Sequence, residues 1–380
     1  MTIRQLVGQV VLLTITVISV GRAQKLPDKR EIVAKLTLAN DYFMKTWPDP
    51  GKEIVTNKTR PSNIWTRAVY YEGLMALYGI DKKKAYYEYA VEWGEKHNWG
   101  LRSGITTRNA DDQCCGQTYM DVYLTDRQPS RIQDIKASID GMVRSDKIDD
   151  WSWVDALQMA MPVFAKLGVL YKDESAAYYE KMYQLYMYSK MKHGGNGLYN
   201  PKDGLWWRDK DFVPPYTEPN GKDCYWSRGN GWVVAALVRV LDIMPNDAPH
   251  RDEYEKTYLE MMRALPPLQR SDGYWNVSLH DPANFGGKEL TGTALFIYGM
   301  AWGVNHGLLD GKTYRPIITK AWNAMATDSV HPNGFLGYVQ GTGKEPKDGQ
   351  PVTYDSKPDF EDYGLGCFLL AGTELYKMKR

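Results

Sequence analysis

Apolar residues recur at alternating steps of three and four along most of the chain, which is the spacing of amphipathic helices. Two kinds of helical segment alternate. One kind has a charged face and begins with ordinary polar residues, and it comprises residues 29–46, 82–97, 130–143, 173–192, 250–265 and 313–327. The other kind is richer in Ala, Gly, Leu and Tyr and follows loops that carry Trp, Asp, Asn or Gly; it comprises residues 64–79, 111–124, 152–168, 229–243, 291–305 and 362–377. We predict outer helices for the first kind and inner helices for the second.

Six outer helices that alternate with six inner ones predict an all-α fold, an (α/α)6 barrel in which the loops before the inner helices form one mouth. Strand signals are sparse and lie in the loops. No linker or change of composition divides residues 24–380, so we predict a single domain. An open solenoid of helix pairs is the alternative, but the repeat lengths are irregular and no consensus recurs, which favours the closed ring.

The first 23 residues have the features of a secretory signal peptide. Arg4 precedes an apolar run at residues 10–20, and Gly21-Arg22-Ala23 ends the segment on a small residue. We expect cleavage near Ala23 and export of the protein, so that it is periplasmic or secreted. The apolar run is short for a transmembrane helix, which leaves an uncleaved anchor as the less favoured alternative.

Charge and metal-ligand patterns exclude several classes of partner. The 47 basic and 46 acidic residues are interspersed, so we expect no nucleic-acid partner and, after signal cleavage, no membrane partner. The four cysteines form no disulfide framework, although a bridge that involves Cys224 stays open. The six histidines lack HxH and HExxH spacing, so we expect no metal and no other cofactor. The 13 Trp and 27 Tyr suit stacking on sugar rings, or equally a helical core.

The strongest candidate for chemistry is Asp155, which lies between the Trp151/Trp153 pair and an apolar helix. A carboxylate in the first turn of an inner helix would face the mouth of the barrel. The helix N-terminus favours the anion, whereas burial among indoles and a nearby carboxylate favour the neutral acid. The alternative is that Asp155 only caps the helix.

Other loops before inner helices carry a similar mixture of polar and aromatic residues: 108–113, 225–232 and 288–293. Asp112 and Asp155 would open successive inner helices, so we expect the two carboxylates to lie close enough to couple. Arg228 could pair with the carboxylate of an acidic sugar in bidentate fashion. Taken singly, these residues also have structural interpretations: Asp112 as a cap, Arg228 as an ion-pair partner, and Trp226 and Trp232 as core.

Four motifs in order resemble glycoside hydrolase family 105, the unsaturated rhamnogalacturonyl hydrolases: Trp153-Val154-Asp155-Ala156-Leu157, Trp226-Ser227-Arg228-Gly229-Asn230-Gly231-Trp232, Thr291-Gly292-Thr293-Ala294 and Asp362-Tyr363-Gly364. The resemblance implies an (α/α)6 barrel that removes a 4,5-unsaturated uronic acid from the non-reducing end of lyase-generated oligosaccharides. It also implies that Asp155 is the general acid and base, and that Asp112, Arg228 and Trp232 contact the substrate.

One loop departs from the family pattern. Where members commonly carry a histidine, this chain reads Leu205-Trp206-Trp207-Arg208-Asp209, so that Arg208 takes the place of the histidine. The reaction is unaffected, but the sugar specificity is open. We therefore predict Asp155 and Asp112 as catalytic residues. The predicted substrate contacts are Arg228, Trp232, Trp226, Trp153, Arg208 and Asn109.

The expected substrate is an oligosaccharide whose terminal uronic acid, galacturonyl linked to rhamnose, contains a C4=C5 double bond. Protonation at C4 and addition of water at C5 need only one carboxyl group, whereas ordinary inverting hydrolysis needs two. Two alternatives remain at this stage. One is another hydrolase or a polysaccharide lyase on the same barrel, and the other is a glycan-binding protein without catalysis.

Overall fold

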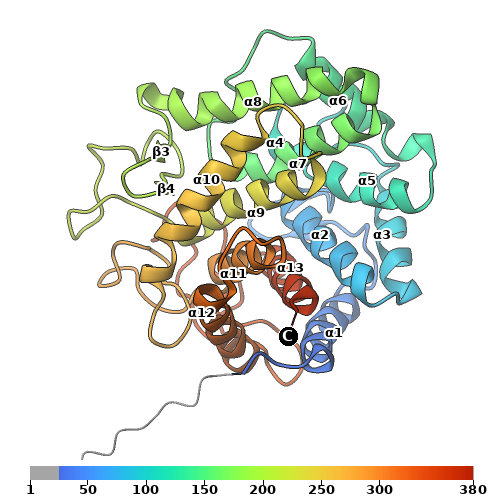
Figure 1. Cartoon of the computed structure of the whole chain (residues 1–380). Coiled ribbons are helices and arrows are strands. Elements are labelled where there is room, and N and C mark those ends of the chain that lie inside the picture. Colours follow the sequence, from blue (N-terminus) through green and yellow to red (C-terminus); the bar gives the residue numbers. More distant parts are fainter. Residues whose placement is uncertain (1–24, 380) are drawn as a thin grey trace, which may run out of the picture.

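Helices form two concentric rings in the computed structural model, which describes residues 25–379 (Figure 1). The inner ring consists of α2 (Trp65–Ile80), α5 (Cys115–Thr125), α7 (Asp155–Leu170), α9 (Ser227–Ile243), α11 (Leu290–Asn305) and α13 (Tyr363–Lys377). The outer ring consists of α1 (Lys29–Thr46), α3 (Lys84–Lys96), α6 (Gln133–Val143), α8 (Ser175–Met191), α10 (Arg251–Ala264) and α12 (Gly311–Ala324). The predicted alternation is therefore confirmed. The predicted signal peptide, residues 1–23, lies outside the described residues.

The inner ring is closed. Each inner helix packs against the next, from α2 to α5, α7, α9, α11 and α13, and α13 packs against α2 in turn. An open solenoid would keep its first and last helices apart. The fold is thus an (α/α)6 barrel, as the sequence predicted.

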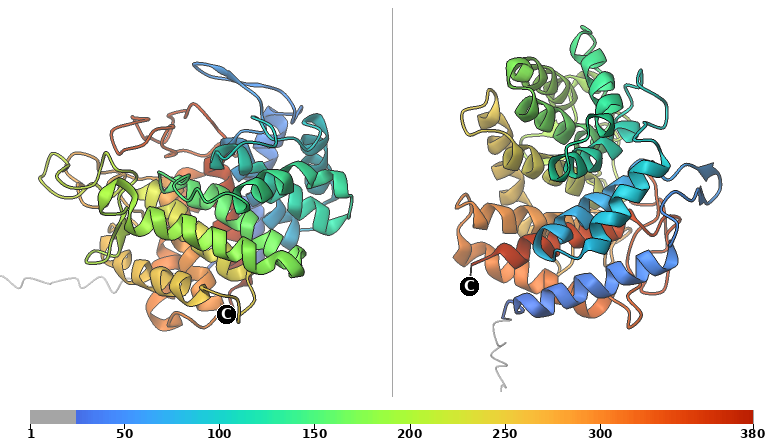
Figure 2. Two further views of the ribbon diagram at one scale, coloured as in Figure 1. Left: turned by 90° about the horizontal axis from the view of Figure 1, so that it is seen from above. Right: turned by 90° about the vertical axis from the view of Figure 1, so that its right-hand side faces the viewer.

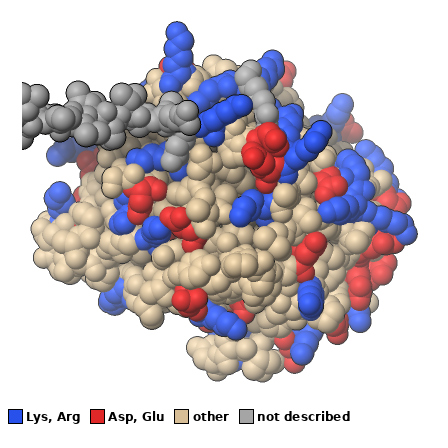
Figure 3. Space-filling model, turned by 90° about the horizontal axis from the view of Figure 1, so that it is seen from below, with Lys and Arg blue, Asp and Glu red and all other residues tan. Residues whose placement is uncertain are grey.

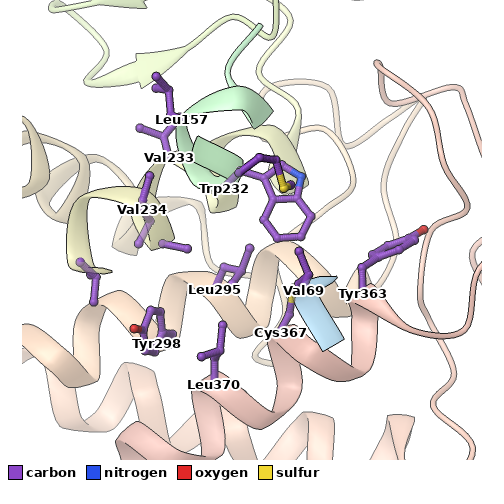
Figure 4. Close-up of a cluster of buried hydrophobic side chains, with 14 of the residues drawn as sticks. Val69, Leu157, Trp232, Val233, Val234, Leu295, Tyr298, Tyr363, Cys367 and Leu370 are labelled. Atoms are coloured by element: carbon purple, nitrogen blue, oxygen red, sulfur yellow. The ribbon is translucent and has the colours of Figure 1, made fainter. Parts of the chain in front are cut away.

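The closure of the ring depends on two facing glycines. A Cβ added to Gly366 of α13 would lie 2.2 Å from the carbonyl oxygen of Val69 in α2, and one added to Gly73 of α2 would lie 2.6 Å from the carbonyl oxygen of Gly366. Val69 and Cys367 belong to the apolar cluster at this contact, together with Leu370 (Figure 4). Only glycine lets the two backbones approach so closely.

We expect Gly366→Ala to destabilise the protein by about 1–3 kcal/mol, because backbone atoms that cannot rotate away would have to shift. The control is Gly79→Ala near the end of α2, where an added Cβ meets nothing within 4 Å. That substitution should be neutral or stabilise by about 0.5–1 kcal/mol. Thermal unfolding of both variants measures the difference, and equal midpoints would contradict the importance of the Gly73–Gly366 contact.

Short elements occupy the loops between the helices. Two antiparallel hairpins pair β1 (Ile54–Val55) with β2 (Thr59–Arg60), and β3 (Tyr199–Asn200) with β4 (Leu205–Trp206). Single turns of helix lie at η1 (Pro129–Arg131), η2 (Lys172–Glu174), η3 (His193–Gly195), η4 (Pro266–Leu268) and η5 (Met325–Ser329). The β1–β2 hairpin and the long loop before α13 project from the same side of the barrel (Figure 2). The predicted confinement of strands to loops is confirmed.

Most helix boundaries differ from the sequence prediction by one to three residues, and two of the differences have a structural cause. The segment predicted as one inner helix at 111–124 is divided at Cys114 into a short helix, α4 (Ala110–Gln113), and α5. The segment predicted to begin at 152 begins at Asp155, because residues 153 and 154 pair with another loop: Trp153 forms an isolated bridge with Asp209, and the Val154 amide donates to the Arg208 carbonyl at 2.9 Å. A long-range contact outweighs helix propensity at both residues.

Cysteines and surface charges agree with the sequence interpretation. All four cysteines are free and buried, so the bridge considered for Cys224 is not formed. Basic and acidic side chains are interspersed on the face in Figure 3. Among residues 25–379, no helix is both long enough and apolar enough to cross a membrane.

Candidate active site

Asp155 is the first residue of α7 and lies at the end of the inner ring from which the helices start. Its side chain is buried, with 7% of the residue exposed. No side-chain capping bond is made at this helix start, where Val154 is the capping residue. Instead, Asp155 Oδ2 accepts a hydrogen bond from Arg208 Nε at 3.2 Å. Asp155 is thus held by a guanidinium, and the capping interpretation does not describe it.

Arg208 follows β4 and connects two carboxylates. Its Nη1 donates to Asp209 Oδ2 at 2.7 Å, while its Nε donates to Asp155. Asp209 Oδ1 in turn accepts from the Asp211 amide at 2.8 Å, which orients that carboxylate. The backbone bond between Val154 and the Arg208 carbonyl brings this loop to the start of α7. Arg208, which was predicted as a substrate contact, therefore lies directly beside the candidate acid.

The second carboxylate near Asp155 is Asp111, and the sequence interpretation missed it. Burial raises the pKa of Asp111 to about 7, and the negative charge of Asp155 adds to this shift. Asp112 points elsewhere: its Oδ1 accepts from Arg102 Nε at 2.6 Å and its Oδ2 from Thr107 Oγ1 at 2.9 Å. The coupling that we expected at Asp112 is thus present at its neighbour. Successive residues of a helix differ in direction by about 100°, so the two neighbouring carboxyl groups have different partners.

Asn109, predicted as a substrate contact, is the N-cap of α4. Its Oδ1 accepts a hydrogen bond from the Asp111 amide at 2.9 Å. This bond determines where the first turn of α4 begins and hence where Asp111 points. Asn109 is exposed, so it remains a candidate contact while it orients the carboxyl group.

The predicted contacts in the fourth inner loop are buried. Arg228 is 1% exposed, and its Nη1 and Nη2 donate to the carbonyls of Gln340 and Gly341 at 2.7 and 2.9 Å. Trp226 packs against the Arg228 guanidinium and donates from Nε1 to Gln340 Oε1 at 2.8 Å. Trp232 is fully buried in the core cluster of Figure 4. Arg228 and Trp226 lie beneath the loop before α13, to which both donate, and the contact of all three side chains with substrate stays a prediction.

We expect Asp111→Asn to change how stability depends on pH. A carboxyl group whose pKa is raised to about 7 in the folded protein stabilises the fold at low pH, and this contribution is lost as the pH rises through 7. The variant should therefore match the wild type near pH 4 and be more stable at pH 8, by about 1 kcal/mol or more.

Urea unfolding at several pH values measures this effect. Asp112→Asn is the matched control, because it removes the partner of Arg102 and should destabilise at both pH values. An unchanged difference between Asp111→Asn and wild type from pH 4 to pH 8 would contradict the coupling.

Comparison with known proteins identifies the family. The sequence profile described as Glycosyl Hydrolase Family 88 matches residues 36–379, and the chain belongs to this family and is a glycoside hydrolase. It is 34% identical over 340 residues to the "Unsaturated 3S-rhamnoglycuronyl hydrolase" of Formosa agariphila. The aligned region spans 83% of this chain and 85% of the relative.

Solved structures support the same assignment. A family 88 glycosyl hydrolase from Bacteroides vulgatus is 32% identical with a TM-score of 0.82, covering 92% of this chain and 99% of that one. A structure described as a polysaccharide lyase is 31% identical with a TM-score of 0.81, and the match covers 92% of this chain and 97% of that one. A family 105 hydrolase from C. acetobutylicum, 19% identical with a TM-score of 0.69 over 90% and 99%, shares the fold. The predicted relationship is confirmed, and the matching profile bears the name of family 88.

Proposed function

We propose that this protein removes a 4,5-unsaturated uronic acid from the non-reducing end of oligosaccharides produced by polysaccharide lyases. Membership of family 88 and the name of the Formosa agariphila relative support this function. The observation that carries it is the pairing of buried Asp155 with Arg208, because the site offers both an acid and a cation for a uronate.

Asp155 performs both proton transfers in this proposal. The substrate is a vinyl ether, so a proton delivered from Asp155 to C4 produces an oxocarbenium-like cation at C5. The resulting carboxylate then assists a water molecule that adds to C5. The C5 hemiketal opens and releases the remaining oligosaccharide. General acid catalysis of this kind requires a carboxyl group that carries its proton at the working pH.

The sugar next to the uronic acid is proposed to be a rhamnose. The curated relative is named for a rhamnoglycuronyl substrate, and the motifs of this chain resemble rhamnogalacturonyl hydrolases, so rhamnose is common to both. A galacturonyl group linked to rhamnose would imply a role in pectin degradation. Two substrates should be assayed in parallel, one with an unsaturated galacturonyl group linked to rhamnose and one with another unsaturated uronyl group linked to rhamnose. The ratio of their kcat/KM values measures the preference of the enzyme for the uronic acid.

Absorbance in the enoate band tests the proposed function. We expect the absorbance of lyase-generated oligosaccharides to fall during incubation, because hydration removes the C4=C5 double bond. A rise in absorbance on intact polysaccharide would show lyase action instead. Tight binding without any change in absorbance would show a glycan-binding protein.

Export of the protein is proposed on the basis of residues 1–23, which resemble a signal peptide. Mass spectrometry of the protein recovered from periplasm and medium tests this proposal. An N-terminus near residue 24 supports it, and full-length protein in the cytoplasm contradicts it.

A further inference from the structure

Pro162 lies inside α7, the inner helix that begins at Asp155. Proline has no N–H group, so it cannot donate to the carbonyl four residues earlier, and its ring crowds that carbonyl. The carbonyl that loses its helical donor in this way belongs to Gln158, which is fully buried. A buried carbonyl without any donor would cost free energy, so a replacement donor at this point stabilises the helix.

Gln117 of α5 supplies this replacement from its side chain. Its Nε2 donates to the Gln158 carbonyl at 2.7 Å and reaches the Met159 carbonyl at 3.3 Å. Gln117 is itself fully buried and lies 41 residues before Gln158 in the chain. A side-chain amide of the neighbouring inner helix thus takes the place of the backbone N–H that α7 lacks.

The orientation of the Gln117 amide is fixed by Arg239 of α9. Arg239 Nε donates to Gln117 Oε1 at 2.9 Å, so the amide oxygen faces α9 and the NH2 group faces α7. The flipped amide would place its NH2 group against the guanidinium and its oxygen against the Gln158 carbonyl, donor against donor and acceptor against acceptor. Only one orientation of Gln117 therefore satisfies both ends of its side chain.

The side chain of Gln158 is held as well. Its Nε2 donates to Glu72 Oε2 of α2 at 2.7 Å, and Arg239 Nε lies 3.8 Å from the same oxygen. Glu72 is 1% exposed, so this contact is closed to water. Three inner helices, α2, α5 and α9, are thus tied to one residue of α7, through its main chain and through its side chain.

Gln158 lies three residues after Asp155, on the same face of α7. The first turn of α7 is therefore fixed at two levels. At its start, Arg208 binds the Asp155 carboxylate at 3.2 Å, and the Arg208 carbonyl accepts from the Val154 amide. One turn later, the network around Gln117 holds Gln158. Because helices bend most readily at a proline, this second attachment sets the direction of the turn that carries Asp155.

We infer that Gln117 is a positioning residue for Asp155: it replaces the donor that Pro162 removes and so fixes the direction in which the first turn of α7 presents the carboxyl group. This inference rests on the proposed function, in which Asp155 delivers a proton to C4. Gln117 is fully buried and acts only through α7. Its loss should therefore lower kcat and leave KM nearly unchanged.

Two substitutions remove the donor to the Gln158 carbonyl. Gln117→Met has a similar length, and Gln117→Glu keeps an oxygen that can accept from Arg239 Nε, so one variant remains informative if the other does not fold. In folded protein we expect kcat to fall by about 10- to 10²-fold, because a misplacement of about 1 Å has an effect of this size, and KM to stay within about twofold. Thermal unfolding shows which variants are folded.

Pro162→Ala tests the mechanism, because alanine restores the N–H that donates to the Gln158 carbonyl. In a double-mutant cycle, the loss of kcat caused by Gln117→Met should be several times smaller in the Pro162→Ala protein than in the wild type. The same comparison is made with Gln117→Glu. A purely structural role for Gln117 would lower the stability but not the kcat of the folded enzyme.

Tyr258→Phe is the matched control. It removes another buried donor to a carbonyl of an inner helix, the bond from Tyr258 Oη to Gly299 of α11 at 2.8 Å, and it should lower stability while kcat stays near the wild-type value. Folded Gln117 variants with normal kcat would overturn the inference, and so would equal losses of kcat with and without Pro162→Ala. Both results leave the proposed function intact. A wild type that does not consume unsaturated uronides would overturn the proposed function instead.

Discussion

Asp155→Asn should abolish turnover while the protein stays folded and binds substrate. The amide has the shape of the carboxyl group but cannot deliver a proton to C4, and loss of a general acid lowers the rate by about 10²–10⁴-fold. Loss of enoate absorbance measures turnover, and thermal unfolding shows whether the variant is folded. Because the amide oxygen can still accept from Arg208 Nε, the loop after β4 should keep its position.

Asp149→Asn is the matched control for this substitution. Asp149 lies six residues earlier in the same loop, is exposed and pairs with Lys147. Its loss should leave kcat and KM near their wild-type values. A folded Asp155→Asn protein with near-normal activity would disprove the assignment of the general acid.

Asp362→Ala should strongly destabilise the barrel. Asp362 is the N-cap of α13, where its Oδ1 accepts from the Tyr363 amide at 2.8 Å and its Oδ2 from Arg67 Nε in α2 at 3.2 Å. Both side chains of the ion pair are at most 2% exposed. Removal of one partner leaves a buried guanidinium without a counter-charge, which typically costs about 3–5 kcal/mol. Because a domain of ordinary stability has only about 5–15 kcal/mol, the melting temperature should fall sharply.

Asp310→Ala is the control for the loss of a helix cap alone. Asp310 caps α12 by accepting from the Lys312 and Thr313 amides, and it lies at the surface without a buried cationic partner. Its replacement should therefore destabilise much less than that of Asp362. Equal losses in the two variants would mean that the Arg67–Asp362 pair adds nothing beyond the cap.

Much of the fold could be predicted because its signals are local. The outer helix predicted at 29–46 is observed at Lys29–Thr46, where Asp28 and Glu31 form a capping box. Periodicity and caps depend on residues within one or two turns, so a sequence displays them directly. The same holds for the alternation of charged and small-residue helices, since the inner ring is buried on every side and the outer ring on one.

The candidate site could be predicted only in part. Sequence placed Asp155 at the start of an inner helix, and the structure confirms that position. The sequence did not show which side chains contact Asp155. Arg208 lies 53 residues away, and its loop reaches α7 through backbone hydrogen bonds that no local pattern encodes. The sequence likewise did not show that the charge of Asp155 acts on Asp111, whereas Asp112 is bound by Arg102 and Thr107.

The sequence by itself thus determined the ring of helices and the residue that opens α7. Only the tertiary structure decided which polar side chains are accessible at the start of the inner helices, since it buried Arg228 under the loop before α13 and left Arg208 partly exposed. The physical reason is that the spacing of apolar residues shows which face of a helix is buried only when the opposite face contacts water and is polar. Inner helices are surrounded by protein, so the direction of each polar side chain depends on partners that lie far away in the sequence.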